Sequence, residues 1–260
     1  MSPGAVTNGI EVERIGDGVL VVTFSRPEVR NAFNTAMYLE ATATLRDAAH
    51  DPEVGAIVLT GRGPAFTSGA DLREMAALAT GTVIEGSHTG FSGFMEAVAE
   101  LPVPLLAAVN GVAVGLGFTL LAHCDMVLVD ASARLRVPFA ELGVPPEAAS
   151  SVLFPARLGW QQAARILLTS DWVSAQELVE LGLALRVCPD GGALPEAVAL
   201  AARIAAHPRG ATRAITSLLR DGQRDMVRAA NRRELAAFGT LLGSAVSTGT
   251  LAGFADRAPS

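Results

Sequence analysis

Two short glycine-containing segments hold the residues of this chain that are best suited to chemistry. They are residues 66–72, which read FTSGADL, and residues 110–117, which read NGVAVGLG. Each follows an apolar run typical of a buried strand and precedes a run typical of a helix. The first backbone N–H groups of a helix have no intrahelical acceptor, so two such turns can direct free N–H groups at one point. Convergent amides stabilise a developing oxyanion, which predicts chemistry on a carbonyl group whose charge is held by the backbone.

The two donors follow from where the helices begin. Gly115 and Gly117 allow a tight entry into a short helix, and Leu116 between them offers its N–H. Ala70 precedes Asp71, an acid suited to a helix N-terminus, so the N–H of Ala70 is free as well. Glycines in either loop alone are explained better by close packing of a helix on a sheet. Both loops together favour an oxyanion hole.

A dinucleotide site fits these glycines less well. Gly115-x-Gly117 followed by Asp130 is part of a dinucleotide-binding fingerprint. However, Leu120 replaces the third glycine, and the intervening helix is too short for a complete β-α-β unit.

The absence of lysine excludes several other mechanisms. All 20 basic residues are arginine, so the chain has no Schiff-base lysine and no phosphate-binding Walker lysine. Ser68 and Ser92 lie outside the Gly-x-Ser-x-Gly sequence of a serine hydrolase.

Composition indicates the class of protein. The chain has 260 residues, half of them apolar, which is enough for one large α/β domain or a core with a small appendage. Cys124 and Cys188 are the only cysteines and the four histidines are scattered, so neither a disulfide framework nor a metal site is expected. This cysteine usage favours a reducing cytoplasm.

Charge is unevenly distributed. The formal net charge is −6, but the last 61 residues carry nine arginines against four acids. Arg220, Arg224, Arg228 and Arg232 recur every four residues, which favours a solvated helical face over a phosphate-binding surface. The overall acidity argues against nucleic-acid binding.

No membrane segment is expected. The N-terminus lacks the cationic start and apolar core of a signal peptide. Residues 101–124 contain no charge and are long enough to span a bilayer, but Pro102, Pro104 and Asn110 interrupt them. A buried strand, loop and helix explain this stretch better.

The pattern of elements predicts an α/β core followed by helices. Ser174 with Glu177 forms a capping box, and helices alone are expected from about residue 193. We therefore expect a core over residues 1–192 and a helical region over residues 193–260. Strands are predicted at residues 19–24, 56–60, 105–109 and 126–129, and helices at 35–50 and 71–79.

Three segments resemble one known family. Residues 26–32 (RPEVRNA), 61–72 (GRGPAFTSGADL) and 110–115 (NGVAVG) are similar to motifs of the enoyl-CoA hydratase/isomerase (crotonase) family, and the resemblance covers nearly the whole chain. It implies an α/β spiral of repeated β-β-α units with a C-terminal helical region that forms a trimer, often a dimer of trimers. It also implies acyl-CoA thioesters as substrates, with coenzyme A as part of the substrate and no separate cofactor.

The same resemblance assigns binding roles. The thioester oxygen would lie between the N–H groups of Ala70 and Leu116. Hydratases usually carry glycine in place of Leu116, and leucine disfavours a positive φ. The residues expected to contact coenzyme A are Arg30, Ala32, Ser68, Ala70, Asp71, Leu72, Arg73 and Leu116.

The expected base departs from the hydratase pattern. The two hydratase glutamates correspond to Thr119 and Phe139, neither of which can act as a base. Residues 139–151 resemble the Pro-Glu-x-x-Ser-Ser segment of peroxisomal-type Δ3,Δ2-enoyl-CoA isomerases, which makes Glu147 the base. An acid that starts a helix after Pro146 is the structural alternative for Glu147. Glu141 is the rival base, although its position suggests an exposed turn.

These observations favour an enoyl-CoA isomerase. The alternatives are an enoyl-CoA hydratase or another crotonase-type lyase, and a non-catalytic scaffold that binds coenzyme A. Met75, Phe91, Phe94 and Met95 either line a pocket for the acyl tail or belong to the core.

Overall fold

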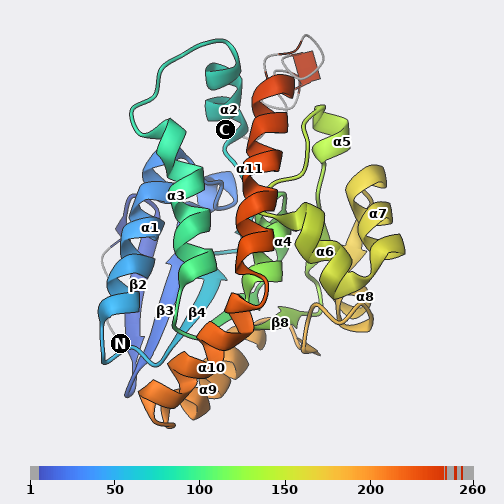
Figure 1. The fold of residues 1–260 in the computed structure, drawn as a ribbon. Coiled ribbons are helices and arrows are strands. Elements are labelled where there is room, and N and C mark those ends of the chain that lie inside the picture. The colour runs from blue at the N-terminus through green and yellow to red at the C-terminus, as the bar shows by residue number, and fades with distance from the viewer. Residues whose placement is uncertain (1–5, 243, 245–248, 251–252, 254–260) are drawn as a thin grey trace.

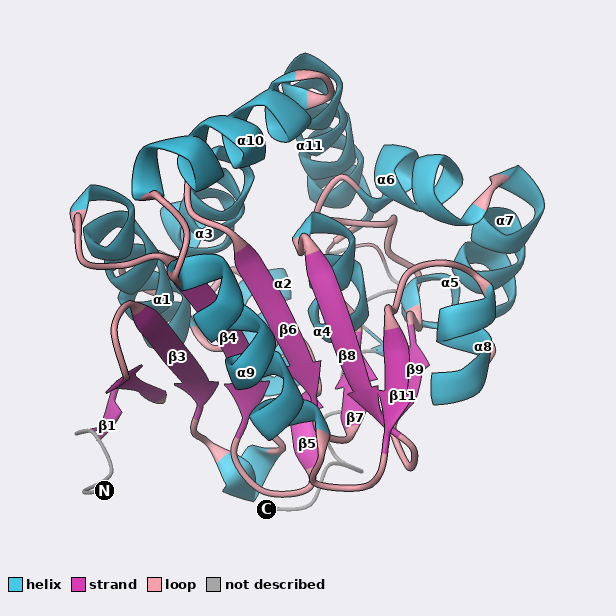
Figure 2. Cartoon of the chain, turned by 90° about the horizontal axis from the view of Figure 1, so that it is seen from below, coloured by secondary structure: helices cyan, strands magenta, loops and turns pink. Residues whose placement is uncertain are grey.

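The computed structural model describes residues 6–242, 244, 249–250 and 253. Within this part of the chain the strands form two sheets, ordered β1-β2-β3-β4-β6-β8-β11 and β10-β9-β7-β5. Helices cover both faces of the larger sheet (Figures 1 and 2). The arrangement agrees with the expected α/β class.

The larger sheet has a parallel centre made of apolar strands. All residues of β3 (Val19–Phe24) and β6 (Leu105–Val109) are buried, as expected for strands covered on both faces. The four predicted strands are confirmed, and β4 and β8 each extend one residue beyond the prediction. The other members are the antiparallel β1 (Val6–Thr7) and β2 (Ile10–Ile15) and the parallel β4 (Ala56–Gly61), β8 (Met126–Asp130) and β11 (Arg186–Cys188).

The smaller sheet repeats the order of the larger one. Its parallel strands β5 (Ala65–Thr67), β7 (Val112–Val114) and β9 (Arg134–Arg136) follow β4, β6 and β8 along the chain. The short strand β10 (Val173–Ser174) pairs antiparallel with β9. Each parallel strand leads toward a helix, namely α2 (Leu72–Ala79), α4 (Leu116–Thr119) and α5 (Phe139–Leu142). The expected spiral of β-β-α units is therefore confirmed.

Each face of the larger sheet has its own covering. Helices α1 (Thr35–His50) and α3 (Ser87–Glu100) pack together over one face. Helix α9 (Ala193–Ala205) lies across the other face (Figure 2). Its alanines recur every four residues, and these small side chains let the helix approach the sheet closely. Asp130 at the end of β8 accepts hydrogen bonds from the N–H groups of Gly191 (2.8 Å) and Ala193 (2.8 Å), which gives it a structural role at the start of this helix.

The final long helix reaches back to the middle of the chain. Helix α11 (Arg224–Leu241) runs beside α3 and α6 (Ser150–Leu158) (Figure 1). Half of the predicted capping box is present: the Ser174 hydroxyl accepts the N–H of Glu177 at 3.2 Å, whereas the Glu177 carboxylate pairs with Arg165. The other described helices are α7 (Trp160–Thr169), α8 (Ala175–Glu180), α10 (Arg209–Asp221) and two short 3-10 helices, Pro27–Val29 and Leu120–His123.

The uncharged stretch at residues 101–124 is interior structure. It forms β6, β7, α4 and a 3-10 turn. Among the helices that the structure describes, none has the length and apolar composition to cross a bilayer.

The expected solvated arginine face is wrong for Arg220. This side chain is 8% exposed, and its guanidinium donates to the carbonyls of Val98 (3.0 Å) and Leu101 (2.6 Å). It also pairs with Asp125 at 3.0 Å. Arg220 therefore ties α10 to the segment that enters β6.

Asn31, in the family-like segment 26–32, bonds this segment to the turn between two strands. It is fully buried and left-handed, with φ 58°. Its amide donates to the carbonyls of Arg62 (2.9 Å) and Ala65 (2.7 Å), and its side-chain oxygen accepts the N–H of Arg26 (2.9 Å). This one side chain thus links the end of β3 to the turn between β4 and β5.

We predict that Asn31→Ala lowers the free energy of unfolding by about 2–4 kcal/mol, because it leaves buried backbone groups without partners. Urea denaturation measures this change. Asn8→Ala is the matched control, since Asn8 is also left-handed (φ 47°) but is exposed and bonds only Glu40 through its side chain among the described residues. Equal effects of the two substitutions would show that backbone strain, and not the buried hydrogen bonds, decides the outcome.

Candidate functional site

The two glycine-containing segments meet where β5 and β7 end. A Cβ at Gly69 would lie 2.6 Å from the Val114 carbonyl oxygen and 3.4 Å from the Leu116 nitrogen. A Cβ at Gly117 would lie 2.6 Å from the Thr67 carbonyl oxygen. Such distances leave no room for a side chain, so glycine at both positions permits the close approach of the two backbones.

The expected donors have no acceptor within the described part of the chain. Phe33 bonds both neighbours of Ala70: its N–H donates to Gly69 (2.7 Å) and its carbonyl accepts from Asp71 (2.8 Å). These contacts fix the backbone on either side of Ala70, whose own N–H takes part in no described hydrogen bond. The N–H of Leu116 at the start of α4 is equally unused. Each of the two glycine-containing segments therefore holds one backbone N–H group, that of Ala70 or Leu116, with no partner among the described residues.

Leucine at position 116 fits without backbone strain. The positive φ of this turn (54°) falls on Gly115, whereas Leu116 is the first residue of α4. The Leu116 side chain is buried in the core.

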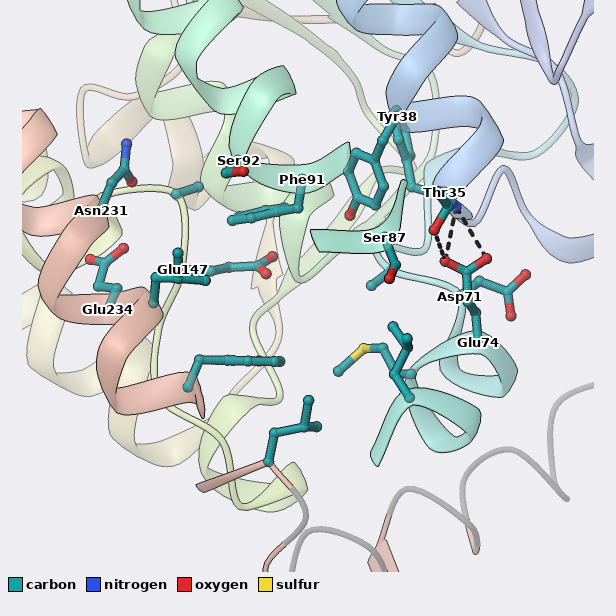
Figure 3. A pocket seen from close by; sticks show the side chains of 18 of the residues that line it. Thr35, Tyr38, Asp71, Glu74, Ser87, Phe91, Ser92, Glu147, Asn231 and Glu234 are labelled. Atoms are coloured by element: carbon teal, nitrogen blue, oxygen red, sulfur yellow. Dashed lines mark hydrogen bonds between the residues drawn. The ribbon is translucent and has the colours of Figure 1, made fainter. Parts of the chain in front are cut away.

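Two cavities meet at Glu147. A cavity of about 260 Å³ is lined by Ala70, Leu116 and Glu147 together. A second cavity, of about 320 Å³, shares Ala70, Met75, Glu147 and Phe238 with the first (Figure 3). The structure thus brings Ala70, Leu116 and Glu147 to the same space.

The other expected binding residues are distributed around these cavities. Arg30, Ser68 and Leu72 line the first cavity, and Asp71 lines the second. Ala32 is buried, Arg73 is exposed, and neither is among the described residues that line the two cavities.

The environment of Glu147 favours the protonated acid. Burial, and then the nearby charge of Glu234, raises the pKa of Glu147 from 4.5 to about 8. The side chain keeps intermediate exposure because its carboxylate points into the cavity, as Figure 3 shows. A carboxyl group with a pKa near neutrality can both take and return a proton.

An unusual turn presents this carboxylate. Ala148 and Ala149 are both left-handed, with φ 58° and 54°, a conformation that is uncommon for residues other than glycine. The Glu147 carbonyl accepts from the N–H (3.0 Å) and hydroxyl (2.6 Å) of Ser150. The Nε2–H of His123 donates to the Ala148 carbonyl at 2.8 Å, and burial lowers the pKa of this imidazole to about 4, which keeps it neutral.

The rival acid Glu141 and the two hydratase positions lie in surroundings that differ from those of Glu147. Glu141 is exposed, pairs with Arg136 and is not among the described residues lining either cavity. Thr119 is buried, with its hydroxyl 3.3 Å from the Gly115 carbonyl. Phe139 contributes an aromatic wall to the first cavity.

Glu234 is the site residue that sequence reasoning missed. It lies on α11 and lines the second cavity. No local motif surrounds it, and only the packing of α11 beside α6 brings it near Glu147.

The expected tail residues divide into two groups. Met75 and Phe91 line the second cavity. Phe94 and Met95 are buried core residues, and Phe94 packs 5.6 Å from the ring of Phe33. Phe254 and Arg257 near the C-terminus also resemble the family in sequence, and both lie outside the described residues.

Comparison with known proteins identifies the family of this chain. The family model "Enoyl-CoA hydratase/isomerase" matches residues 14–259. The chain belongs to this family. A crystal structure of an enoyl-CoA hydratase/isomerase from Pseudoalteromonas atlantica superposes with a TM-score of 0.90 at 34% identity, over 97% of this chain and 99% of that one. The crotonase fold is thus confirmed.

The curated relatives have different names. A probable enoyl-CoA hydratase from Rhodobacter capsulatus is 36% identical over 80% of this chain and 80% of its own length. Human enoyl-CoA delta isomerase 2 is 33% identical over 84% of this chain, which spans 56% of that protein. Family membership therefore leaves the reaction to be decided by the site.

We predict that Glu147 makes stability depend on pH. Because the folded state binds this proton more tightly than the unfolded state, the contribution of Glu147 to the free energy of unfolding falls as pH rises from 4.5 to about 8. Glu147→Gln cannot ionise, so it should gain stability relative to the wild type between pH 5 and pH 9. Urea denaturation at several pH values measures this gain.

The matched control is Glu85→Gln, which removes an exposed carboxylate by the same chemical change. Its difference from the wild type gives the effect of losing one surface charge. Stability curves for Glu147→Gln and the wild type that stay parallel from pH 5 to 9 would contradict the expected coupling.

Proposed function

We propose that this protein is an acyl-CoA enzyme that moves a double bond from C3 to C2 of an enoyl-CoA thioester, with Glu147 as its single base. The observation that supports this most is the shared cavity of Ala70, Leu116 and Glu147. Two unused amides and one carboxyl group of raised pKa are what a proton shuttle beside a carbonyl group requires.

The reaction uses this geometry in two steps. The Glu147 carboxylate removes a proton from C2, and the electron pair moves onto the thioester oxygen to give a dienolate. The N–H groups of Ala70 and Leu116 bind that oxygen, and each such donor contributes about 3 kcal/mol to stabilising its charge. Glu147 then returns the proton to C4, the C2–C3 double bond forms and the thioester carbonyl is restored.

The two cavities suggest how the substrate lies. We place the thioester and the start of the pantetheine in the first cavity, where Arg30 offers a cation for the phosphates of coenzyme A. Ser68 and residues 70–73 complete the expected contacts, with Ala32 near the nucleotide. The acyl chain occupies the second cavity, whose lining includes Met75 and Phe91.

A hydratase is the second candidate, since the Rhodobacter relative is named as one. Water addition by this family uses two carboxylates that hold one water. Glu234 is the nearby second carboxylate, but both of its oxygens already accept backbone N–H groups. This favours the isomerase over the hydratase. A scaffold without catalysis is disfavoured by the position of Glu147 beside both amides.

We also propose that the chain forms a homotrimer or a dimer of trimers through residues 193–260. Helix α10 supports this, because it exposes Ile215, Leu218 and Leu219 to 59%, 73% and 66%. Apolar side chains gathered on one exposed helix are typical of a protein interface.

We predict that Glu147→Gln lowers kcat for conversion of 3-enoyl-CoA to 2-enoyl-CoA by at least about 100-fold, because the proton shuttle is removed. Absorbance of the conjugated thioester follows this reaction. Glu141→Gln is the control, since it removes an exposed carboxylate that lies outside the described lining of both cavities, and it should retain activity. Efficient hydration of 2-enoyl-CoA that survives in Glu147→Gln would overturn the proposal.

The acyl cavity should also discriminate by charge. Its described lining contains four carboxyl groups, those of Asp71, Glu74, Glu147 and Glu234, and no arginine. The free carboxylate of a dicarboxylic acyl group, at the far end of the acyl chain, would be buried there without a cation. We therefore expect kcat/KM for 3-hexenedioyl-CoA to be at least roughly tenfold below that for 3-hexenoyl-CoA.

Leu78→Arg tests this expectation directly. Leu78 lines the same cavity, so an arginine there should raise kcat/KM for the diacid relative to the neutral substrate. Leu78→Met, a change of similar volume without charge, is the control. Equal kcat/KM values for the two substrates with the wild-type enzyme would show that the carboxylates do not select the acyl group.

A further inference from the structure

Glu234 makes an unusual pair of contacts with the turn that follows Glu147. Its Oε2 accepts the N–H of Ala149 at 2.7 Å, and its Oε1 accepts the N–H of Ser151 at 2.9 Å. The residue is only 6% exposed. Hydrogen bonds to an ionised acceptor in a buried setting are among the stronger ones in proteins.

These N–H groups belong to the start of α6. Ala149 is the N-cap residue of this helix, and no side chain of its own segment caps it. Unpaired amides at a helix N-terminus favour an anion. A residue of α11 therefore supplies the cap that α6 lacks locally, and it does so with a charged group.

The contacts also hold a strained backbone. Ala148 and Ala149 are consecutive left-handed residues, and such conformations persist only where surrounding contacts enforce them. His123 holds the Ala148 carbonyl from one side, and Glu234 holds the Ala149 amide from the other. Glu147 directly precedes Ala148 and Ala149 in the chain.

Two described side chains from distant segments, Glu234 and His123, form hydrogen bonds with the turn at residues 148–151. Of these two, only Glu234 bears a charge, because His123 is neutral. The remaining titratable or charged side chains that line the two cavities are Tyr38 on α1, Asp71 and Glu74 at α2, Arg30, and Arg136 on β9. Asp71 pairs with Arg26, Glu74 accepts the N–H of Thr35, and Arg136 pairs with Glu141.

We propose that Glu234 is a positioning residue for the reaction: it fixes the turn that presents the Glu147 carboxylate to the cavity, and its negative charge acts on that carboxylate. Figure 3 shows the Glu147 carboxylate extending into the cavity and Glu234 at the cavity wall on α11. This inference rests on the proposed role of Glu147 as the base.

The pH profile of kcat distinguishes the two proposed effects of Glu234: positioning of the Glu147 turn and the action of its negative charge on Glu147. Glu234→Gln removes the negative charge and leaves one oxygen to accept a backbone N–H. We expect kcat for double-bond migration to fall by about tenfold to a hundredfold, with KM changed less than about twofold, because the base is misplaced while the binding contacts remain. In the plot of kcat against pH, the limb is the part where kcat changes as Glu147 ionises. This limb should move to lower pH, since the negative charge of Glu234, which opposes ionisation of Glu147, is gone.

Glu234→Asp keeps the charge but is too short to reach both amides. It should lower kcat to a similar extent while leaving the limb close to its wild-type position. If Glu234→Gln does not fold, as judged by near-ultraviolet circular dichroism, this variant still tests the positioning role. Asp225→Asn is the control: it removes an exposed acid from the same helix and should leave both kcat and the limb unchanged.

A folded Glu234→Gln enzyme with wild-type kcat and an unmoved limb would overturn the inference, as would a folded Glu234→Asp enzyme with wild-type kcat. A reduced kcat with an unmoved limb in Glu234→Gln would overturn the part played by charge. Full activity of Glu147→Gln would instead refute the proposed function itself, so the two failures are distinguishable.

Discussion

The close approach of two backbones at the ends of β5 and β7 is the constraint on which the site depends. Glycine at positions 69 and 117 allows this approach, and a methyl group at either would collide with a carbonyl oxygen of the opposite segment. The smaller sheet sets this separation, since it pairs β5 with β7. Because both amides belong to this rigid contact, they are oriented before any substrate arrives, and preorganised donors need no rearrangement as charge develops.

The acid side of the site is built differently. Glu147 lies on an irregular turn whose backbone groups are held by side chains from distant segments, His123 and Glu234. The positions of the two amides therefore depend on strand pairing and on glycine, whereas the position of the Glu147 carboxylate depends on contacts with segments far away in the sequence. Burial that would disfavour a charged group elsewhere is useful here, because it brings the pKa of Glu147 to about 8.

Sequence patterns predicted the elements whose signals are local. Helix 35–50 and strands 19–24 and 105–109 were predicted with the observed bounds, since caps and unbroken apolar runs are read directly from the chain. β2 was missed because its sequence, IEVERI, mixes charged and apolar residues. The burial of Arg220 and the role of Glu234 depend on partners more than 80 residues away, which helical periodicity cannot reveal.

The contact between α11 and α6 has a consequence for biosynthesis. Both residues of the amide pair, Ala70 and Leu116, are synthesised well before Glu234, which follows Leu116 by 118 positions along the chain. Domains acquire structure from the N-terminus during translation. A nascent chain that ends before α11 therefore contains Ala70, Leu116 and Glu147, yet lacks the carboxylate that caps α6. The turn that carries the proposed base therefore gains these two hydrogen bonds only after α11 has been synthesised.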